Sequence, residues 1–118
     1  MNTQATLPPH AWVNVLSEVL CVDVASKMDS IDISYQRLDK ALEGLQQREI
    51  SGLLARYGMG YTFKQCADVM KDKEGTGTIS PERAREILMK TVRKLRRPYK
   101  IKLIESSICA YWNLYDED

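Results

Sequence analysis

Apolar residues recur at intervals of three and four along most of the chain, which is the spacing of one face of an α-helix. Pro8 and Pro9 are typical of a helix start, because proline is tolerated in a first turn. The stripe that follows predicts a helix to about residue 26, and it consists of Trp12, Val15, Leu16, Val19 and Leu20. Two more helices are expected at about 34–45 and 48–57. Their apolar faces are Leu38, Ala41, Leu42 and Leu45, then Ile50, Leu53, Leu54 and Tyr57. Gly58 follows, where a glycine commonly adopts the left-handed conformation that ends a helix.

The second half of the chain is predicted to be helical as well. Thr62 is a candidate N-cap for a short helix at 63–70, and a polar loop follows at 72–78. Ser80-Pro81-Glu82 has the residue types of a helix start, and Pro98 predicts that this helix stops near residue 96. A last helix is expected at about 101–115, with an apolar stripe of Ile101, Ile104, Ile108 and Trp112. The pattern therefore predicts an all-α protein.

The helices predicted at 63–70 and 80–96 form a helix-turn-helix pattern, in which the second helix is basic. Their connection, about 71–79, is longer than the three or four residues that are usual in this motif. Such lengthening costs little, because the entropy of closing a loop grows slowly with its length.

Length and composition narrow the class of protein. The 118 residues suffice for one domain, and 44% apolar and 28% charged residues are ordinary for a soluble globular chain. No apolar run is long enough to span a bilayer. Three widely spaced cysteines and a single histidine argue against a disulfide framework and against a zinc site, so we expect a cytoplasmic protein. No phosphate-binding glycine loop or activated nucleophile is evident, so we expect neither an enzyme nor a cofactor.

The net charge of +1 conceals a strong asymmetry along the chain. Residues 1–70 carry a net charge of −2, residues 71–102 carry +7, and residues 103–118 carry −4. A basic block of this kind is expected of a segment that binds a polyanion. As a hypothesis, the acidic end folds back over the basic surface and restrains that binding.

The helix predicted at 80–96 has two chemically different faces. Its inward face is predicted to consist of Ala84, Ile87, Leu88, Thr91 and Leu95, and its outward face of Glu82, Arg85, Glu86, Met89 and Arg93. Arginine suits guanine O6 and N7, and glutamate can accept a hydrogen bond from cytosine N4. Seven basic residues without an intervening acid are predicted to contact phosphates: Lys90, Arg93, Lys94, Arg96, Arg97, Lys100 and Lys102.

An ordered set of motifs over about 34–100 resembles region 4 of the sigma-70 family of bacterial RNA polymerase sigma factors. The motifs are LEGLQQREI at 42–50, ARYGM at 55–59, TFKQCADVM at 62–70, SPERAREI at 80–87 and RKLRRP at 93–98. The resemblance implies a helix-turn-helix domain that binds the −35 element of promoter DNA. It also implies that the surface around 42–57 contacts the β flap of RNA polymerase.

The resemblance implies roles for individual residues. Ser80 caps the recognition helix, Glu82 and Arg85 read bases, and Arg83 makes a phosphate or structural contact. Arg56, Thr62 and Lys94 contact the DNA backbone. Together with the charged face, the predicted DNA-binding residues are Arg56, Thr62, Ser80, Pro81, Glu82, Arg83, Arg85, Glu86, Met89, Lys90, Arg93, Lys94 and Arg97.

The chain departs from the family pattern in several places. Pro81 stands where a basic residue is common, and Glu86 stands where glutamine is common, so a consensus −35 hexamer is not implied. The chain has no aromatic cluster for melting the −10 element. The chain is therefore expected to be an excised domain, one half of a split sigma factor whose second sigma-like subunit supplies that part, or a stand-alone regulator. Segments 1–33 and 101–118 lie outside the match, and we expect their helices to pack on the domain's own core, with a homodimer or the docking of a partner as the alternatives.

Two rival functions follow from other features. Residues 72–83 resemble a twelve-residue calcium loop, but the last position is Arg83 where that motif needs a bidentate glutamate. The chain is alternatively a protein-interaction module of helix-turn-helix ancestry, which binds RNA polymerase or a sigma factor without reading DNA. The sequence favours a non-enzymatic transcription factor that binds promoter DNA.

Overall fold

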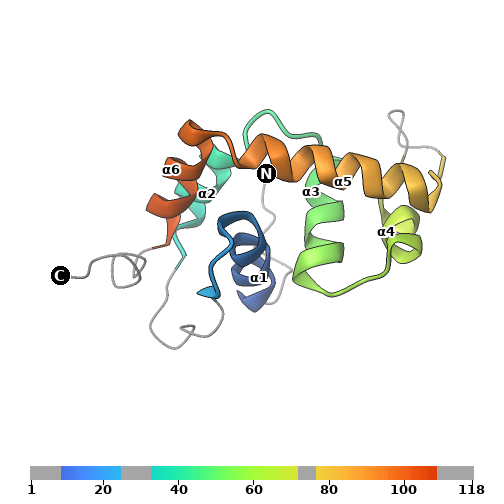
Figure 1. The fold of residues 1–118 in the computed structure, drawn as a ribbon, viewed down its shortest axis with the longest axis horizontal. Helices are drawn as coiled ribbons and strands as arrows, with labels where there is room; N and C mark the ends of the chain where they lie inside the picture. The colour runs from blue at the N-terminus through green and yellow to red at the C-terminus, as the bar shows by residue number, and fades with distance from the viewer. Residues whose placement is uncertain (1–8, 25–32, 72–76, 109–118) are drawn as a thin grey trace.

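The computed structural model describes residues 9–24, 33–71 and 77–108, and most of these residues lie in helices (Figure 1). The helices are α1 (Pro9–Leu20), α2 (Tyr35–Ala41), α3 (Gln47–Leu53), α4 (Phe63–Val69), α5 (Pro81–Leu95) and α6 (Pro98–Ser107). A π-helical turn, η3 (Leu54–Gly58), continues α3. Within the described ranges, extended pairing is confined to two isolated bridges, Ile33 with Ile108 and Lys71 with Thr78. The predicted all-α class is confirmed.

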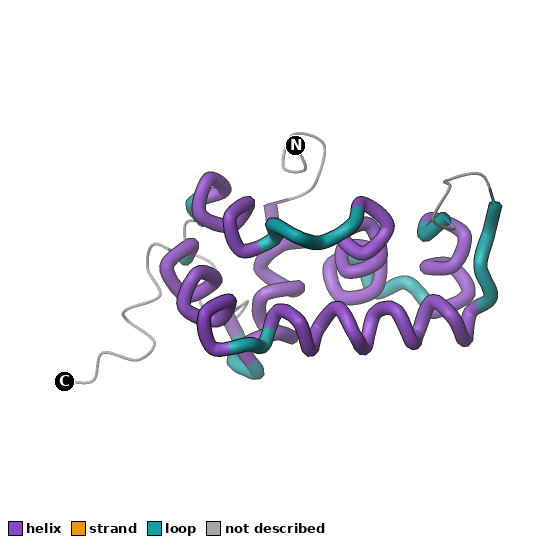
Figure 2. The backbone as a smooth tube through the Cα atoms, turned by 90° about the horizontal axis from the view of Figure 1, so that it is seen from above, coloured by secondary structure: helices purple, strands orange, loops and turns teal. Residues whose placement is uncertain are grey.

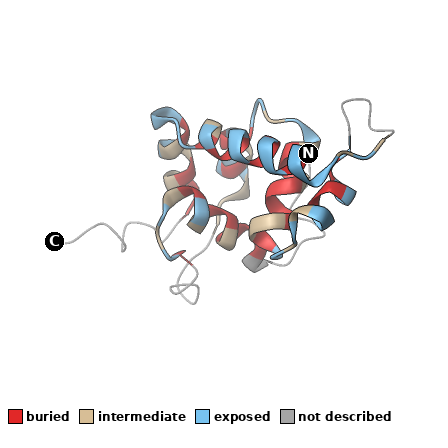
Figure 3. Ribbon diagram, turned by 45° about the vertical axis from the view of Figure 1, so that its right-hand side comes forward, coloured by how far each residue is buried: buried red, intermediate tan, exposed pale blue. Residues whose placement is uncertain are grey.

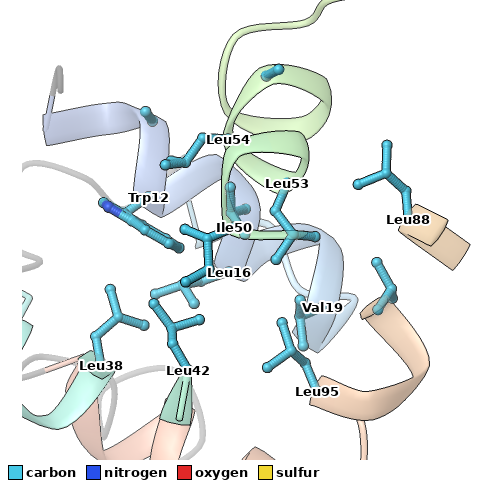
Figure 4. Packing of buried hydrophobic residues seen from close by; sticks show 14 of the residues in the cluster. Trp12, Leu16, Val19, Leu38, Leu42, Ile50, Leu53, Leu54, Leu88 and Leu95 are labelled. Carbon is cyan, nitrogen blue, oxygen red and sulfur yellow. The ribbon is translucent and has the colours of Figure 1, made fainter. Parts of the chain in front are cut away.

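One hydrophobic core joins helices from both halves of the chain. Helix α1 lies between α3 and the pair formed by α2 and α6 (Figure 1). Its stripe is buried: Trp12 is fully inaccessible, and Leu16 and Val19 are 1% and 2% exposed. Figure 4 shows these side chains among Leu38, Leu42, Ile50, Leu53 and Leu95. The expectation that the N-terminal helix packs on the domain's own core is confirmed.

Helix α1 is shorter than predicted, and a left-handed residue marks its end. Cys21 has a φ of 58°, and so the helix cannot continue through it to residue 26. Arg96 donates to the main-chain oxygens of Glu18 and Val19, at 2.8 and 3.1 Å, and these are carbonyls that a helix end leaves without a partner. A side chain distant in sequence therefore supplies hydrogen-bond donors to the carbonyl groups at the end of α1.

The prediction of a left-handed cap at Gly58 is wrong. The described glycines with positive φ are Gly44 and Gly60, whereas Gly58 lies within η3. The reason for a glycine at Gly58 is space, because a Cβ added there would lie 3.0 Å from the main-chain oxygen of Ala11. Asn14 Nδ2 also donates to the Gly58 oxygen at 3.3 Å. Gly58 thus allows α1 and η3 to approach closely.

Helix α5 packs against α3 and α4, and the three helices are in close contact around Gly52 of α3. A Cβ added at Gly52 of α3 would lie 2.6 Å from Met70 Sδ and 2.9 Å from Leu88 Cδ2. On α4, the buried side chains are those of Cys66 and Ala67. Burial raises the pKa of the Cys66 thiol. The contacts fix α5 along the outside of α3 and α4.

Helix α6 begins three residues earlier and ends sooner than predicted. Pro98 occupies its first turn, so this proline opens a helix as well as following one. After Ser107 the backbone of Ile108 becomes extended and pairs with Ile33. Of the predicted stripe, Ile104 and Ile108 are buried and Ile101 is half-buried, and Trp112 lies outside the described residues.

Among the helices that the structure describes, none has both the length and the apolar character needed to cross a membrane.

Candidate nucleic-acid interface

Helix α5 presents one buried and one exposed face along its whole length (Figure 3). The buried side chains are Ala84, Ile87, Leu88, Thr91, Val92 and Leu95. All five predicted inward residues are therefore confirmed, and Val92 joins them. The predicted outward residues Glu82, Arg85, Glu86, Met89 and Arg93 are all exposed. Met89 is an apolar side chain on this charged face, and 45% of it is exposed.

The first turns of α5 carry balanced charge. Ser80 Oγ accepts a hydrogen bond from the Arg83 amide at 3.0 Å, as predicted for an N-cap, and Pro81 takes the first turn. Arg83 and Glu86 form an exposed ion pair at 3.4 Å. An exposed pair of this kind contributes little to stability, so both side chains can also contact a ligand.

Positive charge gathers instead at the C-terminal half of α5. Four basic side chains line a hollow of about 300 Å³, which we call the basic hollow: Lys90, Arg93, Lys94 and Arg97. All four are among the predicted DNA-binding residues. Hence α5 has a nearly neutral end and a strongly basic end.

Three of the seven predicted phosphate contacts have partners within the protein. Lys100 is 9% exposed, and its Nζ donates to the main-chain oxygens of Ala41 and Glu43 at 2.8 and 2.7 Å. Arg96 holds the end of α1, as described above. The prediction that Lys100 serves as a surface phosphate contact is therefore wrong, because its ammonium group donates hydrogen bonds to carbonyl oxygens at the end of α2 and in the turn that follows.

The third internal partner is Lys94, which bonds the carboxylate of Glu49. Lys94 Nζ lies 2.8 Å from Glu49 Oε2, and Thr91 Oγ1 lies 3.3 Å from the same oxygen. Glu49 Oε1 accepts from the Gln46 amide at 2.8 Å. The side chain of Lys94 remains 39% exposed at the rim of the basic hollow.

The pKa of Glu49 reflects this network. Burial is the largest single influence on the pKa and raises it, since a buried carboxylate loses hydration. The hydrogen bonds from Lys94, Gln46 and Thr91, together with the charge of Lys94, outweigh burial. The pKa therefore lies below its ordinary value of 4.5, and Glu49 is ionised at neutral pH.

Arg56 and Thr62 are held at the start of α4. Arg56 Nη1 donates to the Tyr61 oxygen at 2.9 Å, and its guanidinium lies 4.0 Å from the centre of the Phe63 ring. Thr62 caps α4 as predicted, because its Oγ1 accepts from the Gln65 amide at 3.2 Å. Arg56 therefore already has a structural role, and Thr62 remains exposed.

A second hollow adjoins the basic hollow and was not predicted. It has a volume of about 210 Å³, and we call it the Tyr99 hollow; its lining is Glu43, Gly44, Leu45, Lys94, Arg97, Tyr99 and Lys100. Tyr99 is 58% exposed. The sequence carried one signal for it, an aromatic residue between Arg97 and Lys100, but no pattern placed that residue beside the connection 42–46.

The rival calcium site depends on residues 72–76, which lie outside the described part of the chain. Cys109 and the acidic end also lie outside it. Among the residues that are described, no group of three or more histidine, cysteine, aspartate or glutamate side chains is placed to hold a metal ion.

No family model, no curated protein and no solved structure matches this chain.

Proposed function

We propose that this protein is a DNA-binding transcription factor, in which α4 and α5 act as a helix-turn-helix pair and α5 lies in the major groove. The observation that carries the proposal is the exposed face of α5. Its first turns offer charged side chains of both signs, which suit base edges, and its last turns offer the basic hollow, which suits phosphates. In this arrangement the N-terminal half selects the sequence and the C-terminal half supplies most of the affinity.

The burial of α3 and η3 changes what can be proposed about RNA polymerase. The resemblance assigns the polymerase contact to about 42–57, but Ile50, Leu53 and Leu54 are buried in the protein's own core. Helix α1 packs against η3, and Trp12 and Leu16 of α1 belong to the same core cluster. A contact with the β flap would therefore use the polar rim of this segment or require α1 to move. DNA binding is accordingly the function that we propose first.

The test is binding to duplex DNA selected from a random pool, followed by anisotropy titrations at several salt concentrations. We expect affinity to fall with salt, with a log–log slope of about −0.9 for each phosphate contacted. Arg85→Ala is expected to reduce the preference for the selected sequence, by about 1–3 kcal/mol if Arg85 contacts a base in bidentate fashion. Arg93→Gln is expected to weaken binding to selected and random duplexes alike.

Lys40→Gln is the matched control, because Lys40 is exposed on α2 and its replacement removes the same charge. We expect it to leave the sequence preference unchanged. Arg93→Gln is preferable to a change at Lys94, since Lys94 also supports Glu49. If the wild-type protein binds no DNA but retains RNA polymerase core in a pull-down, the interaction module is the correct function.

A further inference from the structure

The Tyr99 hollow is continuous with the basic hollow. Lys94 and Arg97 line both of them, so one surface runs from the C-terminal half of α5 to the connection between α2 and α3. Figure 2 shows this connection passing alongside the end of α5 that leads into α6. The two hollows are lined by five basic residues and one acidic residue, and Glu49 adds a second carboxylate because it bonds Lys94. The basic residues are Lys90, Arg93, Lys94, Arg97 and Lys100, and the acidic lining residue is Glu43.

The hollow is held in shape by internal hydrogen bonds. Lys100 fastens the first turn of α6 to the oxygens of Ala41 and Glu43, and Glu49 fastens Lys94. Gly44 lies in the wall with a φ of 92°, and no atom lies within 4 Å of the position that its Cβ would take. A ligand can therefore approach the backbone there without a rearrangement, which lowers the cost of binding.

The free chemistry of the hollow comes from Arg97 and Tyr99. Both side chains are exposed, and Arg97 is the extended residue between α5 and α6 that lines both hollows. A guanidinium group and a phenol hydroxyl are both hydrogen-bond donors that commonly contact DNA phosphates. The aromatic ring adds a flat apolar surface beside them.

The length of α5 decides which part of the DNA reaches this hollow. The 15 residues of α5 give the helix a length of about 22 Å, whereas the major groove is about 12 Å wide. If α5 enters the groove by its N-terminus, so that only its first turns contact base edges, its last turn lies outside the groove. The end of α5 then stands against the sugar–phosphate backbone that borders the groove.

We infer that the Tyr99 hollow binds the DNA backbone next to the base pairs contacted by α5. Arg97 pairs with one phosphate, and the Tyr99 hydroxyl donates a hydrogen bond to the same or the adjacent phosphate. This inference rests on the proposed function, and it extends the DNA contact beyond α5 to α6 and to the connection 42–46.

The experiment compares three variants of the full chain on a duplex selected with the wild-type protein. Arg97→Gln is expected to make the salt slope shallower by about 0.9. Tyr99→Phe is expected to weaken binding about three- to tenfold, the loss of one hydrogen bond. Lys40→Gln is the control for charge, because Lys40 is exposed on α2, does not line either hollow and is not among the predicted DNA contacts. All three changes lie on the surface, and thermal unfolding checks that each variant is folded.

Methylphosphonate substitutions then locate the phosphate, since each one removes a single backbone charge. We expect one substitution, outside the selected base pairs, to weaken the wild-type protein and to have no further effect on Arg97→Gln. The inference is overturned if Arg97→Gln behaves like Lys40→Gln and no substitution distinguishes it from wild type. Salt-sensitive binding by the wild-type protein in that same experiment leaves the proposed function standing, whereas its absence overturns both.

Discussion

At the scale of single residues, Glu49 connects the start of α3 to the surface of α5. One oxygen accepts from the Gln46 amide, and the other accepts from Lys94 and Thr91. Only 7% of Glu49 is exposed, so its charge depends on these partners for compensation. The motif LEGLQQREI contains Glu49, but nothing in its spacing indicated that this residue would form an ion pair with Lys94. That pairing depends on how α3 packs on α5.

Glu49→Gln is expected to lower the free energy of unfolding at pH 7 by about 1–3 kcal/mol, because it removes a charged acceptor from a largely buried network. The effect should depend on pH. The folded-state pKa of Glu49 is lowered, so its stabilisation is present above the unfolded value of about 4.5 and disappears as the pH falls through the folded value. Urea denaturation of both proteins from pH 7 to pH 3 measures this, and a difference that stays constant would contradict it.

At the scale of elements, local sequence signals determine where α5 begins and which face is buried, whereas long-range contacts determine which of its cations stay free. The cap at Ser80, the proline at Pro81 and the inward stripe all follow from residue types at helical spacing, and the structure confirms each of them. The two ends of α5 differ in a way that the sequence indicated only partly. Three of the seven cations expected on its basic end and beyond are bonded internally, because neighbouring helix ends offer carbonyl or carboxylate oxygens.

Ser80→Ala is expected to destabilise the protein by about 1 kcal/mol, since the amide of Arg83 loses its acceptor. Ser80→Gly should cost only a few tenths of a kcal/mol, as glycine is itself tolerated at an N-cap. Thermal unfolding of the two variants checks the order. Equal losses would show that the hydroxyl of Ser80 contributes little to the stability of α5.

At the scale of the whole molecule, α1 belongs to the same core as α2, α3, α4, α5 and α6. Its burial of Trp12 and Leu16 uses an apolar surface that would otherwise be available to a partner. The end of α6 is tied in as well, since Ile108 is buried and pairs with Ile33. The intact unit therefore extends at least to Ile108, and a truncation within α6 would damage the core.

Removal of residues 109–118 tests the hypothesis that the acidic end restrains DNA binding. The deletion removes Asp116, Glu117 and Asp118 and leaves Ile108 in place. We expect DNA affinity to rise, most clearly at low salt, because the removed charges repel phosphates. Anisotropy titrations at two salt concentrations measure the change. Unchanged or weaker binding by a truncated protein that melts like wild type would refute the hypothesis.

The sequence by itself determined the helical class, the caps at Thr62 and Ser80, and the two faces of α5. These features depend on residues within about four positions of one another, so the spacing of apolar and capping residues is enough to predict them. Only the tertiary structure decided which cations remain free for a ligand and that α1 covers η3. It also decided that Tyr99 and Gly44 line the same hollow. Such features bring together residues 40 or more positions apart, and they depend on how helices of given length and shape pack.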